Sequence, residues 1–276
     1  MGTLFRIGRT PLVQVDGVHV KLECSNPSGS VKDRLARFLV EQAARRGELA
    51  LGDTIVEATS GNMGIALALV GRELGYRVKV FMPEHMGSER REMLQALGAE
   101  VVLTPRALGF AETLRRRDEH RGRPGHWIPD QFANEDNVRC HRETTGRELV
   151  DALAAARVRR LDAFVAGVGT GGTLMGVAEA LRERWPRVRI VAVEPAEASA
   201  LSGGAIGEHG IHGIGEGFVP AILRRERIDA VETVSTREAH AATEALHAEQ
   251  GWCAGLSSGA NLVAARRLAV RGAVVA

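Results

Sequence analysis

Short apolar runs alternate with amphipathic stretches along almost the whole chain, and this alternation limits the fold more than any other feature. The strand-like runs lie at residues 18–24, 53–58, 76–82, 100–103, 162–167 and 188–194. Helical spacing of apolar residues follows most of them, with Gly, Ser or Thr at the junctions. Strands that alternate with helices predict a mostly parallel α/β architecture, whose two halves form two lobes with a ligand cleft.

Local signals predict where several helices begin. We expect a helix to begin at Ile65, another to span about 142–156, and a third to begin near Ala260. Ser235 and Glu238 have the spacing of a capping box, in which each side chain accepts a hydrogen bond from the backbone of the other.

Charge and hydropathy argue against nucleic-acid binding and against a membrane-spanning segment. The chain has 276 residues, 45% apolar and 25% charged, with a net charge of +2, as in an ordinary globular protein. Basic and acidic residues are mixed, and we interpret the run Arg115–Arg117 as the solvated face of a helix. We therefore expect no nucleic-acid partner. No apolar run is long enough to span a membrane, and we expect no N-terminal signal peptide because no such pattern appears in the sequence.

The cysteines indicate a reducing compartment. Cys24, Cys140 and Cys253 are odd in number and far apart, so they predict neither a disulfide framework nor a zinc site. The histidines lack the spacing of metal ligands, and we expect no metal. A cytoplasmic location follows from this cysteine usage.

The stretch 26–34, NPSGSVKDR, places a lysine behind a flexible polar turn. Of 36 basic residues only three are lysines. Lys21 and Lys79 lie in strand-like runs, whereas Lys32 stands at the start of a helical pattern. Lysine, unlike arginine, can lose its proton and act as a nucleophile or form a Schiff base. A surface lysine at a helix start is the alternative.

A glycine-rich loop, GVGTGGT at 167–173, lies between a strand and a helix. Its backbone amides and hydroxyls suit a phosphate at a helix N-terminus. The loop also matches G-x-G-x-x-G, and Glu194 ends the next strand, so a nicotinamide-dependent enzyme is an alternative. A tight turn without a ligand is the remaining interpretation.

Two further loops could bind a ligand. Thr59-Ser60-Gly61-Asn62 opens a helix, and its hydroxyls, amide and backbone N–H groups could hold a carboxylate without a fixed charge. A helix cap is the alternative interpretation. The loop 255–259, GLSSG, could likewise supply a helix cap or a ligand hydroxyl, and Gln131 has no local signal.

Taken together, these loops resemble the cysteine synthase (O-acetylserine sulfhydrylase) and cystathionine β-synthase family of pyridoxal 5'-phosphate enzymes, known as fold type II. The motifs, in chain order, are GRTPL, NPSGSVKDR, EATSGNMGIALA, MPEHMGSERREMLQALGAEVVLT, DQFANEDN, GVGTGGTLMGV, HGIHGIGEGFVP and AGLSSGA. The resemblance implies a two-lobed α/β fold, similar to the tryptophan synthase β chain, with the active site in the cleft. Residues 36–135 would form a smaller mobile lobe, and 1–35 with 136–276 the larger lobe.

The resemblance also implies residue roles. Lys32 would carry the cofactor and move the Cα proton of the substrate. The other cofactor-binding residues would be Asn62 at the ring hydroxyl, Ser257 at the pyridine nitrogen, and Gly169, Thr170, Gly171, Gly172 and Thr173 at the phosphate. The substrate-binding residues would be Thr59, Ser60, Gly61, Asn62, Met63, Gln131 and Gly215.

The implied reaction is a β-replacement that makes L-cysteine from O-acetyl-L-serine and sulfide and releases acetate. The alternatives are O-phosphoserine, thiosulfate or a non-sulfur nucleophile as reactant, or a catalytically impaired, cofactor-binding regulatory protein. The family also implies a homodimer and a serine acetyltransferase partner, whose C-terminal tail enters the active site.

Two positions depart from the family pattern. Met63 stands where the family usually has Thr, so a hydroxyl near the substrate carboxylate is lost and we expect donor affinity to change. The chain ends at Ala276, before a Ser/Gly-rich turn that family members usually place near the pyridine ring, so it is either naturally short or a truncated form. We expect its absence to weaken the surroundings of the ring nitrogen.

Overall fold

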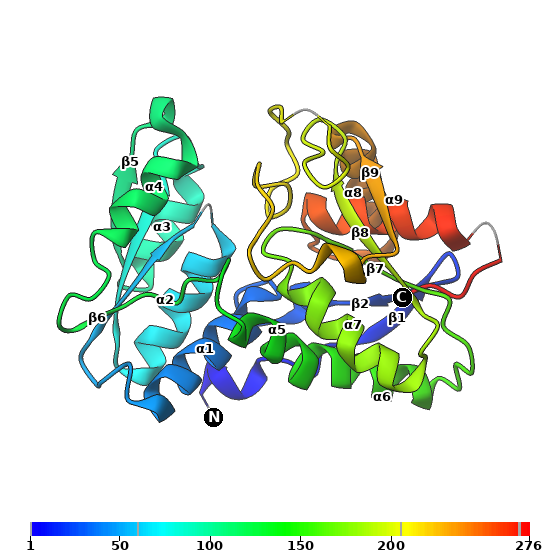
Figure 1. The fold of residues 1–276 in the computed structure, drawn as a ribbon, viewed down its shortest axis with the longest axis horizontal. Helices are drawn as coiled ribbons and strands as arrows, with labels where there is room; N and C mark the ends of the chain where they lie inside the picture. The colour runs from blue at the N-terminus through cyan, green and yellow to red at the C-terminus, as the bar shows by residue number, and fades with distance from the viewer. Residues whose placement is uncertain (1, 60, 205, 270–271) are drawn as a thin grey trace. The chain divides into compact units, whose positions relative to one another are not determined.

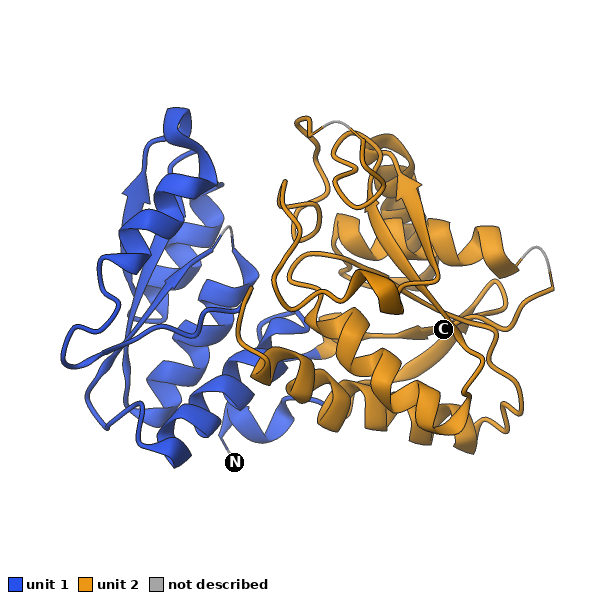
Figure 2. Cartoon of the chain, in the orientation of Figure 1, with its two compact units in different colours: residues 1–8, 26–131 blue, residues 9–25, 132–276 orange. Residues whose placement is uncertain are grey.

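The computed structural model describes residues 2–59, 61–204, 206–269 and 272–276. The chain divides into two compact units, shown in blue and orange in Figure 2. Unit 1 consists of residues 1–8 and 26–131, and unit 2 of residues 9–25 and 132–276. The predicted lobe boundaries at 36 and 135 stay a prediction.

Unit 1 contains a four-stranded parallel sheet with the strand order β5-β4-β3-β6. Its strands are β3 (Thr54–Ala58), β4 (Arg77–Pro83), β5 (Glu100–Thr104) and β6 (His126–Trp127). The first three confirm the predicted runs, and Lys79 lies in β4 as expected. Strand β6 was not predicted, because two residues are too few to show an alternating pattern.

Four α-helices surround this sheet, with α2 and α4 packed against β4 and α1 packed against α2 (Figure 1). Their bounds are α1 (Lys32–Arg46), α2 (Asn62–Leu74), α3 (Ser88–Ala96) and α4 (Gly109–Asp118), with 3-10 turns η1 (Thr3–Arg6) and η3 (Arg106–Leu108). The prediction that a helix begins at Ile65 was wrong by three residues. Apolar periodicity detects only buried positions, and Asn62 in the first turn is exposed.

Unit 2 contains a parallel three-stranded sheet, β7-β8-β9, and an antiparallel hairpin, β1-β2. The strands are β1 (Leu12–Val15), β2 (Val18–Lys21), β7 (Ala163–Gly167), β8 (Arg189–Pro195) and β9 (Ala230–Val234). Alternate residues of the sheet enter two different apolar clusters: Phe164 and Ile190 pack in one, and Val165 and Val191 in the other. Burial of both faces explains why these runs are continuously apolar.

The helices of unit 2 are α5 (Asp136–His141), a π-helical turn η4 (Arg142–Gly146), α6 (Arg147–Ala155), α7 (Gly172–Arg184), α8 (Thr236–Gln250) and α9 (Leu256–Ala269), with 3-10 turns η2 (Glu23–Ser25) and η5 (Arg225–Arg227). The helix predicted at 142–156 therefore begins earlier, at Asp136, and contains a π turn. Helix α9 begins four residues before the predicted Ala260, because its first residues are Ser- and Gly-rich and lack an apolar period.

The capping box at the start of α8 is confirmed. The Ser235 hydroxyl accepts a hydrogen bond from the Glu238 amide at 3.3 Å, and the Glu238 carboxylate accepts one from the Ser235 amide at 3.0 Å. In contrast, the interpretation of Arg115–Arg117 as a solvated face was wrong for one residue. The Arg115 and Arg116 side chains are about half exposed, but Arg117 is 4% exposed and lies 3.3 Å from the buried carboxylate of Glu57.

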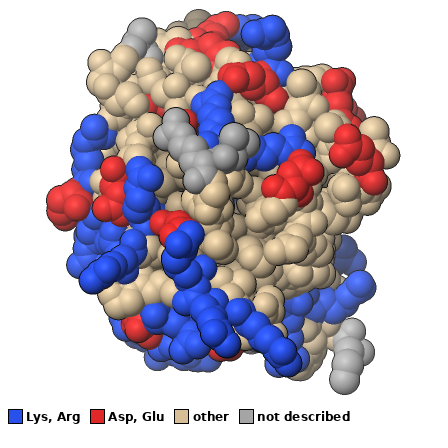
Figure 3. Space-filling view, turned by 90° about the vertical axis from the view of Figure 1, so that its right-hand side faces the viewer, with Lys and Arg blue, Asp and Glu red and all other residues tan. Residues whose placement is uncertain are grey.

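Positive and negative side chains are mixed on the face of the molecule that Figure 3 shows, and Lys and Arg gather toward its lower part. Ion pairs such as Arg182–Asp229 at 2.9 Å and Arg142–Glu183 at 3.0 Å connect elements of unit 2. Within the described ranges, no helix has the length and apolar character needed to cross a bilayer.

Candidate active site

Lys32 is the first residue of α1, directly after the turn 26–31. Its backbone amide donates to the Ser30 hydroxyl at 3.2 Å, and its side chain is half-buried. Gly29 has φ = +83°, a left-handed conformation that glycine adopts without strain. The predicted flexible turn is thus a tight turn of defined geometry, and Lys32 follows it as the first residue of α1.

The carboxylate of Asp33 holds this turn in place. It accepts hydrogen bonds from the backbone amide of Ser28, at 2.7 Å, and from the Ser28 hydroxyl, while its own side chain is fully buried. Asn26, at the start of the turn, accepts from the Gly8 amide at 2.9 Å. The residues around Lys32 therefore fix its backbone before any ligand binds.

Two of the predicted carboxylate-binding residues, Thr59 and Gln131, lie at one edge of the unit 1 sheet. Strands β3 and β6 are parallel neighbours, and Ile55 pairs with Trp127. Thr59 lies four residues beyond Ile55, and Gln131 lies four residues beyond Trp127. Both residues therefore follow the carboxyl ends of adjacent strands, at the same edge of the sheet, although they are 72 positions apart in sequence.

The loop after β3 has a defined start. The Thr59 amide donates to the Phe81 carbonyl at 3.1 Å, and the Thr59 hydroxyl accepts from the Gly61 amide at 3.1 Å. A Cβ at Gly61 would lie 3.1 Å from the Arg90 side chain, so glycine permits this close approach. Ser60, another predicted substrate residue, lies outside the described residues.

Asn62 and Met63 are consecutive residues of α2 with opposite environments. Asn62 is exposed at the helix N-terminus, where an amide can reach a ligand. Met63 is 1% exposed, and its side chain belongs to the core of unit 1. Its predicted role as a substrate contact stays a prediction.

The predicted phosphate loop opens the 13-residue helix α7 in unit 2. Among the described residues, no backbone oxygen accepts a hydrogen bond from the amides of Gly169, Thr170 or Gly171. A Cβ at Gly169 would overlap the Gly213 carbonyl oxygen, and one at Gly172 would overlap the Asn137 side chain. The loop thus presents available N–H donors at a helix N-terminus, which suits an anion.

Two side chains that the sequence did not identify hold the hydroxyls of this loop. Asn137 Nδ2 donates to the Thr170 hydroxyl at 3.0 Å, and His141 Nε2 lies 3.3 Å from the Thr173 hydroxyl. His141 Nδ1 in turn lies 2.9 Å from the Thr145 hydroxyl, within the π-helical turn. Only the three-dimensional packing of α5 beside α7 reveals this support.

Gly215 also lies beside the phosphate loop, because its amide donates to the Val168 carbonyl at 3.0 Å. It has φ = +70°, and a Cβ there would lie 2.6 Å from Pro195. Ser257 is the second residue of α9 and is half-buried. A Cβ on Gly259 would overlap the backbone of Ala239, so glycine lets the start of α9 approach α8 closely.

The surroundings of Glu194 argue against the nicotinamide alternative. A dinucleotide site needs an acidic side chain that is available to the ribose hydroxyls. Glu194 is 2% exposed, and its oxygens accept from the amides of Leu201, at 2.7 Å, and Ser202, at 2.9 Å. This carboxylate instead fixes the loop that follows β8.

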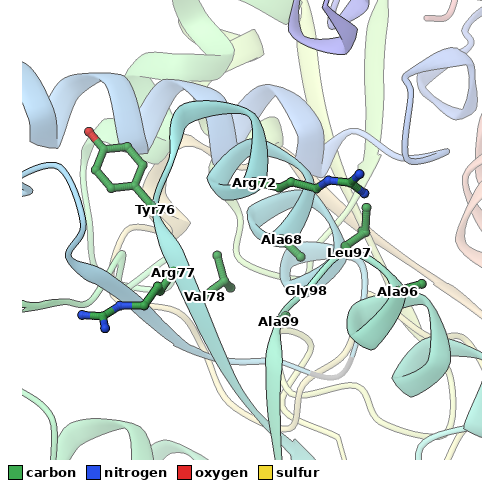
Figure 4. A pocket seen from close by; sticks show the side chains of 9 residues that line it. All are labelled: Ala68, Arg72, Tyr76, Arg77, Val78, Ala96, Leu97, Gly98 and Ala99. Atoms are coloured by element: carbon green, nitrogen blue, oxygen red, sulfur yellow. The ribbon is translucent and has the colours of Figure 1, made fainter.

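A cavity of about 370 Å³ in unit 1 contains none of the predicted site residues. Figure 4 shows its lining residues, which are Ala68, Arg72, Tyr76, Arg77, Val78, Ala96, Leu97, Gly98 and Ala99. They come from α2, the start of β4 with the residue before it, the last residue of α3 and the segment between α3 and β5, away from the carboxyl edge of the sheet.

Comparison with known proteins defines the class. Residues 3–275 match the family model of pyridoxal-phosphate dependent enzymes, and the chain belongs to this family. It is 43% identical over 267 residues to a cysteine synthase of Staphylococcus aureus, covering 94% of this chain and 85% of the relative.

Solved structures of two relatives share the fold of this chain. The structure of O-ureido-L-serine synthase has a TM-score of 0.93 at 42% identity, covering 99% of this chain and 89% of that one. The structure of cysteine synthase from Entamoeba histolytica has a TM-score of 0.90 at 37% identity, covering 99% and 85%. The fold is thus the α/β fold type II of pyridoxal-phosphate enzymes, as predicted.

The residues present fit this cofactor. The phosphate loop offers backbone donors at a helix N-terminus, as the phosphate requires. Lys32 offers an amine at a fixed helix start, as a Schiff base requires. Pyridoxal phosphate is the cofactor of the family, and nothing in the described side chains conflicts with it.

Proposed function

We propose that the chain makes L-cysteine from O-acetyl-L-serine and sulfide, releasing acetate. The observation that carries this proposal is the parallel pairing of β3 with β6, which Thr59 and Gln131 follow at the carboxyl ends, in a chain that is 43% identical to a cysteine synthase over 94% of its length. In the net reaction the Cβ–O bond of the donor breaks and a Cβ–S bond forms, so no oxidant or reductant is needed.

Different residues of the chain would bind the cofactor, bind the substrate and transfer the proton. Lys32 would hold the cofactor and move the Cα proton, and Thr59, Asn62 and Gln131 would orient the donor carboxylate. The loop 169–173 would bind the cofactor phosphate, and Ser257 would face the pyridine nitrogen. When bound, the cofactor supplies an electron sink that allows the Cα–H bond to break. A neutral serine at the ring nitrogen moderates that sink and favours loss of the β-substituent.

Substitution of Lys32 tests the function directly. In Lys32→Ala we expect the visible absorbance of the bound cofactor to disappear and cysteine formation to fall by about 1,000-fold or more, because the amine both holds the cofactor and moves the proton. Lys79→Ala is the control, since Lys79 is a strand residue that pairs with Glu100 at 2.8 Å. Cysteine synthesis by Lys32→Ala at the wild-type rate would contradict the proposal.

A β-replacement with a non-sulfur nucleophile is the second candidate. The 42% identity to an O-ureido-L-serine synthase favours it, because that relative shares the fold over 99% of this chain. A competition assay with sulfide, thiosulfate and oxygen or nitrogen nucleophiles, each with O-acetylserine or O-phosphoserine, separates these reactions. The pair with the largest kcat/KM identifies the substrates.

We also propose a homodimer, a cytoplasmic location and a serine acetyltransferase partner. Large apolar side chains such as Phe5, 77% exposed, and Leu108, 57% exposed, support a subunit contact. The three cysteines are free, as in a reducing compartment. The residues proposed to bind the donor carboxylate, Thr59, Asn62 and Gln131, would also suit the C-terminal carboxylate of a partner protein. Light scattering, cell fractionation and competition by a C-terminal peptide test these three points.

A further inference from the structure

Glu57 is a fully buried carboxylate next to the candidate substrate loop. It lies on β3, two residues before Thr59, and is 0% exposed. One oxygen accepts from the Ala58 amide at 2.8 Å, and the other is buried with no hydrogen-bond partner among the described residues. Burial raises the pKa of Glu57, and the nearby Arg117 partly opposes this effect. Burying a carboxylate in this way costs folding free energy unless the carboxylate is paired with an opposite charge and hydrogen-bonded.

Arg117 connects Glu57 to a second carboxylate. Its Nη1 atom lies 3.3 Å from Glu57 Oε1 and 3.4 Å from Asp130 Oδ1. Asp130 also accepts from Arg121 Nη2 at 2.9 Å. The buried guanidinium therefore bridges β3 and the segment after β6, which are the two backbone segments that lead to the carboxylate-binding residues.

The backbone at Asp130 requires this support. Its φ of +52° lies in the left-handed region, which Asp adopts more readily than most residues but still at a cost. Asp130 immediately precedes Gln131, whose side chain is 3% exposed. A turn held by two arginines thus determines where Gln131 points.

We propose that Glu57, Arg117 and Asp130 form a positioning network that holds the Thr59 loop and Gln131 together to receive the substrate carboxylate. This inference rests on the proposed function of that edge as the carboxylate site. None of the three is assigned a contact with substrate; they act through the backbone of their neighbours. The planar guanidinium suits this role because it can bind two carboxylates in fixed directions.

Substitution of Asp130 tests the network with little risk to folding. Asn tolerates a positive φ, so Asp130→Asn removes the charge but keeps the turn. Asp118→Asn is the matched control. Asp118 accepts hydrogen bonds from both Arg117 and Arg121, but unlike Asp130 it does not precede a proposed substrate-binding residue. A second variant, Arg117→Lys, keeps the positive charge but removes the planar guanidinium that contacts both Glu57 and Asp130.

The readout compares L-alanine with L-alaninamide, which differs only at the carboxylate, as titrants of the cofactor absorbance. Wild-type protein should prefer L-alanine. We expect Asp130→Asn and Arg117→Lys to reduce that preference by about tenfold, the value of a hydrogen bond to a charged group, and Asp118→Asn to leave it within about twofold. The affinity for pyridoxal phosphate itself should not change.

Two outcomes would overturn the proposal. Equal weakening of L-alanine and L-alaninamide binding would mean that the network is only structural, and an unchanged preference in folded Asp130→Asn would mean that it does not reach the carboxylate site. These measurements need no turnover. If the wild-type protein makes no cysteine while Asp130→Asn and Arg117→Lys show the predicted loss of preference, the proposed function is contradicted and the network stands.

Discussion

At the scale of single residues, Met63 combines a buried side chain with a sequence position that indicates a contact with the substrate. The side chain is 1% exposed, so Met63→Thr would remove apolar volume from a packed core. We expect the free energy of unfolding to fall by about 2–3 kcal/mol, and the KM for O-acetylserine to change by less than about threefold. Urea unfolding and steady-state kinetics measure the two quantities.

Met63→Leu is the control for this prediction, because a volume-conserving exchange costs less than about 1.5 kcal/mol. A several-fold change in donor KM at unchanged stability would instead support the expectation from family resemblance, in which position 63 acts near the substrate carboxylate. The two measurements thus decide between a packing role and a binding role.

How far the sequence predicts a site residue depends on whether its partners are local. Lys32 and the loop 169–173 were identifiable as candidates, because a turn, a helix start and the glycines lie within a few residues of one another. Arg117 was misinterpreted, since its partner Glu57 is 60 positions away and its neighbours in the arginine run are exposed. His141 gave no signal for the same reason, because Thr173 lies on another helix.

At the scale of elements, the phosphate loop should not tolerate a side chain at Gly169. A Cβ there would overlap the Gly213 carbonyl oxygen, and backbone cannot move aside as a flexible side chain can. We expect Gly169→Ala to displace the N–H donors and weaken cofactor binding by about tenfold or more. Dialysis against decreasing pyridoxal phosphate, followed by absorbance, measures the retained cofactor.

Gly87→Ala is the matched glycine control. Gly87 has negative φ, and a Cβ there would meet only a Glu89 oxygen at 3.8 Å. Cofactor binding by Gly87→Ala should equal that of the wild type. A Gly169→Ala protein that retains full cofactor would show that the loop does not bind the phosphate.

The capping box of α8 provides a pH-dependent prediction. Hydrogen bonds from Ser235, and then the charge of Arg267, lower the pKa of Glu238 from 4.5 to about 2. The folded state therefore prefers the ionised form, so its stabilisation is present above pH 4.5 and is lost as the pH falls toward 2. Glu238→Gln should destabilise the protein by less than about 1 kcal/mol at pH 7, because the side chain is partly exposed.

The difference between Glu238→Gln and wild type should shrink as the pH is lowered through that window, and denaturant unfolding at several pH values measures it. Glu249→Gln, at an exposed position near the end of the same helix, should show no comparable pH dependence. A Glu238→Gln effect that stays constant down to the acid limit would mean that the carboxylate charge is not what stabilises the cap.

Elements with a strong local pattern were predictable, and those defined by tertiary pairing were not. The parallel strands β7 and β8 have continuous apolar runs because both faces of their sheet are buried. Strand β6 has only two residues and exists because Thr54 and Ile55 of β3 pair with it. That pairing places Gln131, so the sequence could assign this residue only through family resemblance.

At the scale of the whole molecule, the candidate ligand groups divide between the two units. The described substrate-binding candidates other than Gly215 lie in unit 1, as does Lys32. The phosphate loop, Gly215 and Ser257 lie in unit 2. If these assignments hold, a substrate analogue and a phosphate should protect different segments of backbone.

Amide hydrogen exchange of the full chain can test this division. Inorganic phosphate added to cofactor-free protein should slow exchange in the segment 167–175, because the amides of Gly169, Thr170 and Gly171 gain acceptors that the described backbone does not provide. L-alanine added to the cofactor-bound protein should slow exchange in segments 57–65 and 129–132 together, since β3 and β6 carry them to one edge. L-alaninamide is the control for the carboxylate. Protection of 57–65 without 129–132 would mean that Gln131 takes no part in binding, and protection by phosphate only within unit 1 would contradict the assignment of the phosphate loop.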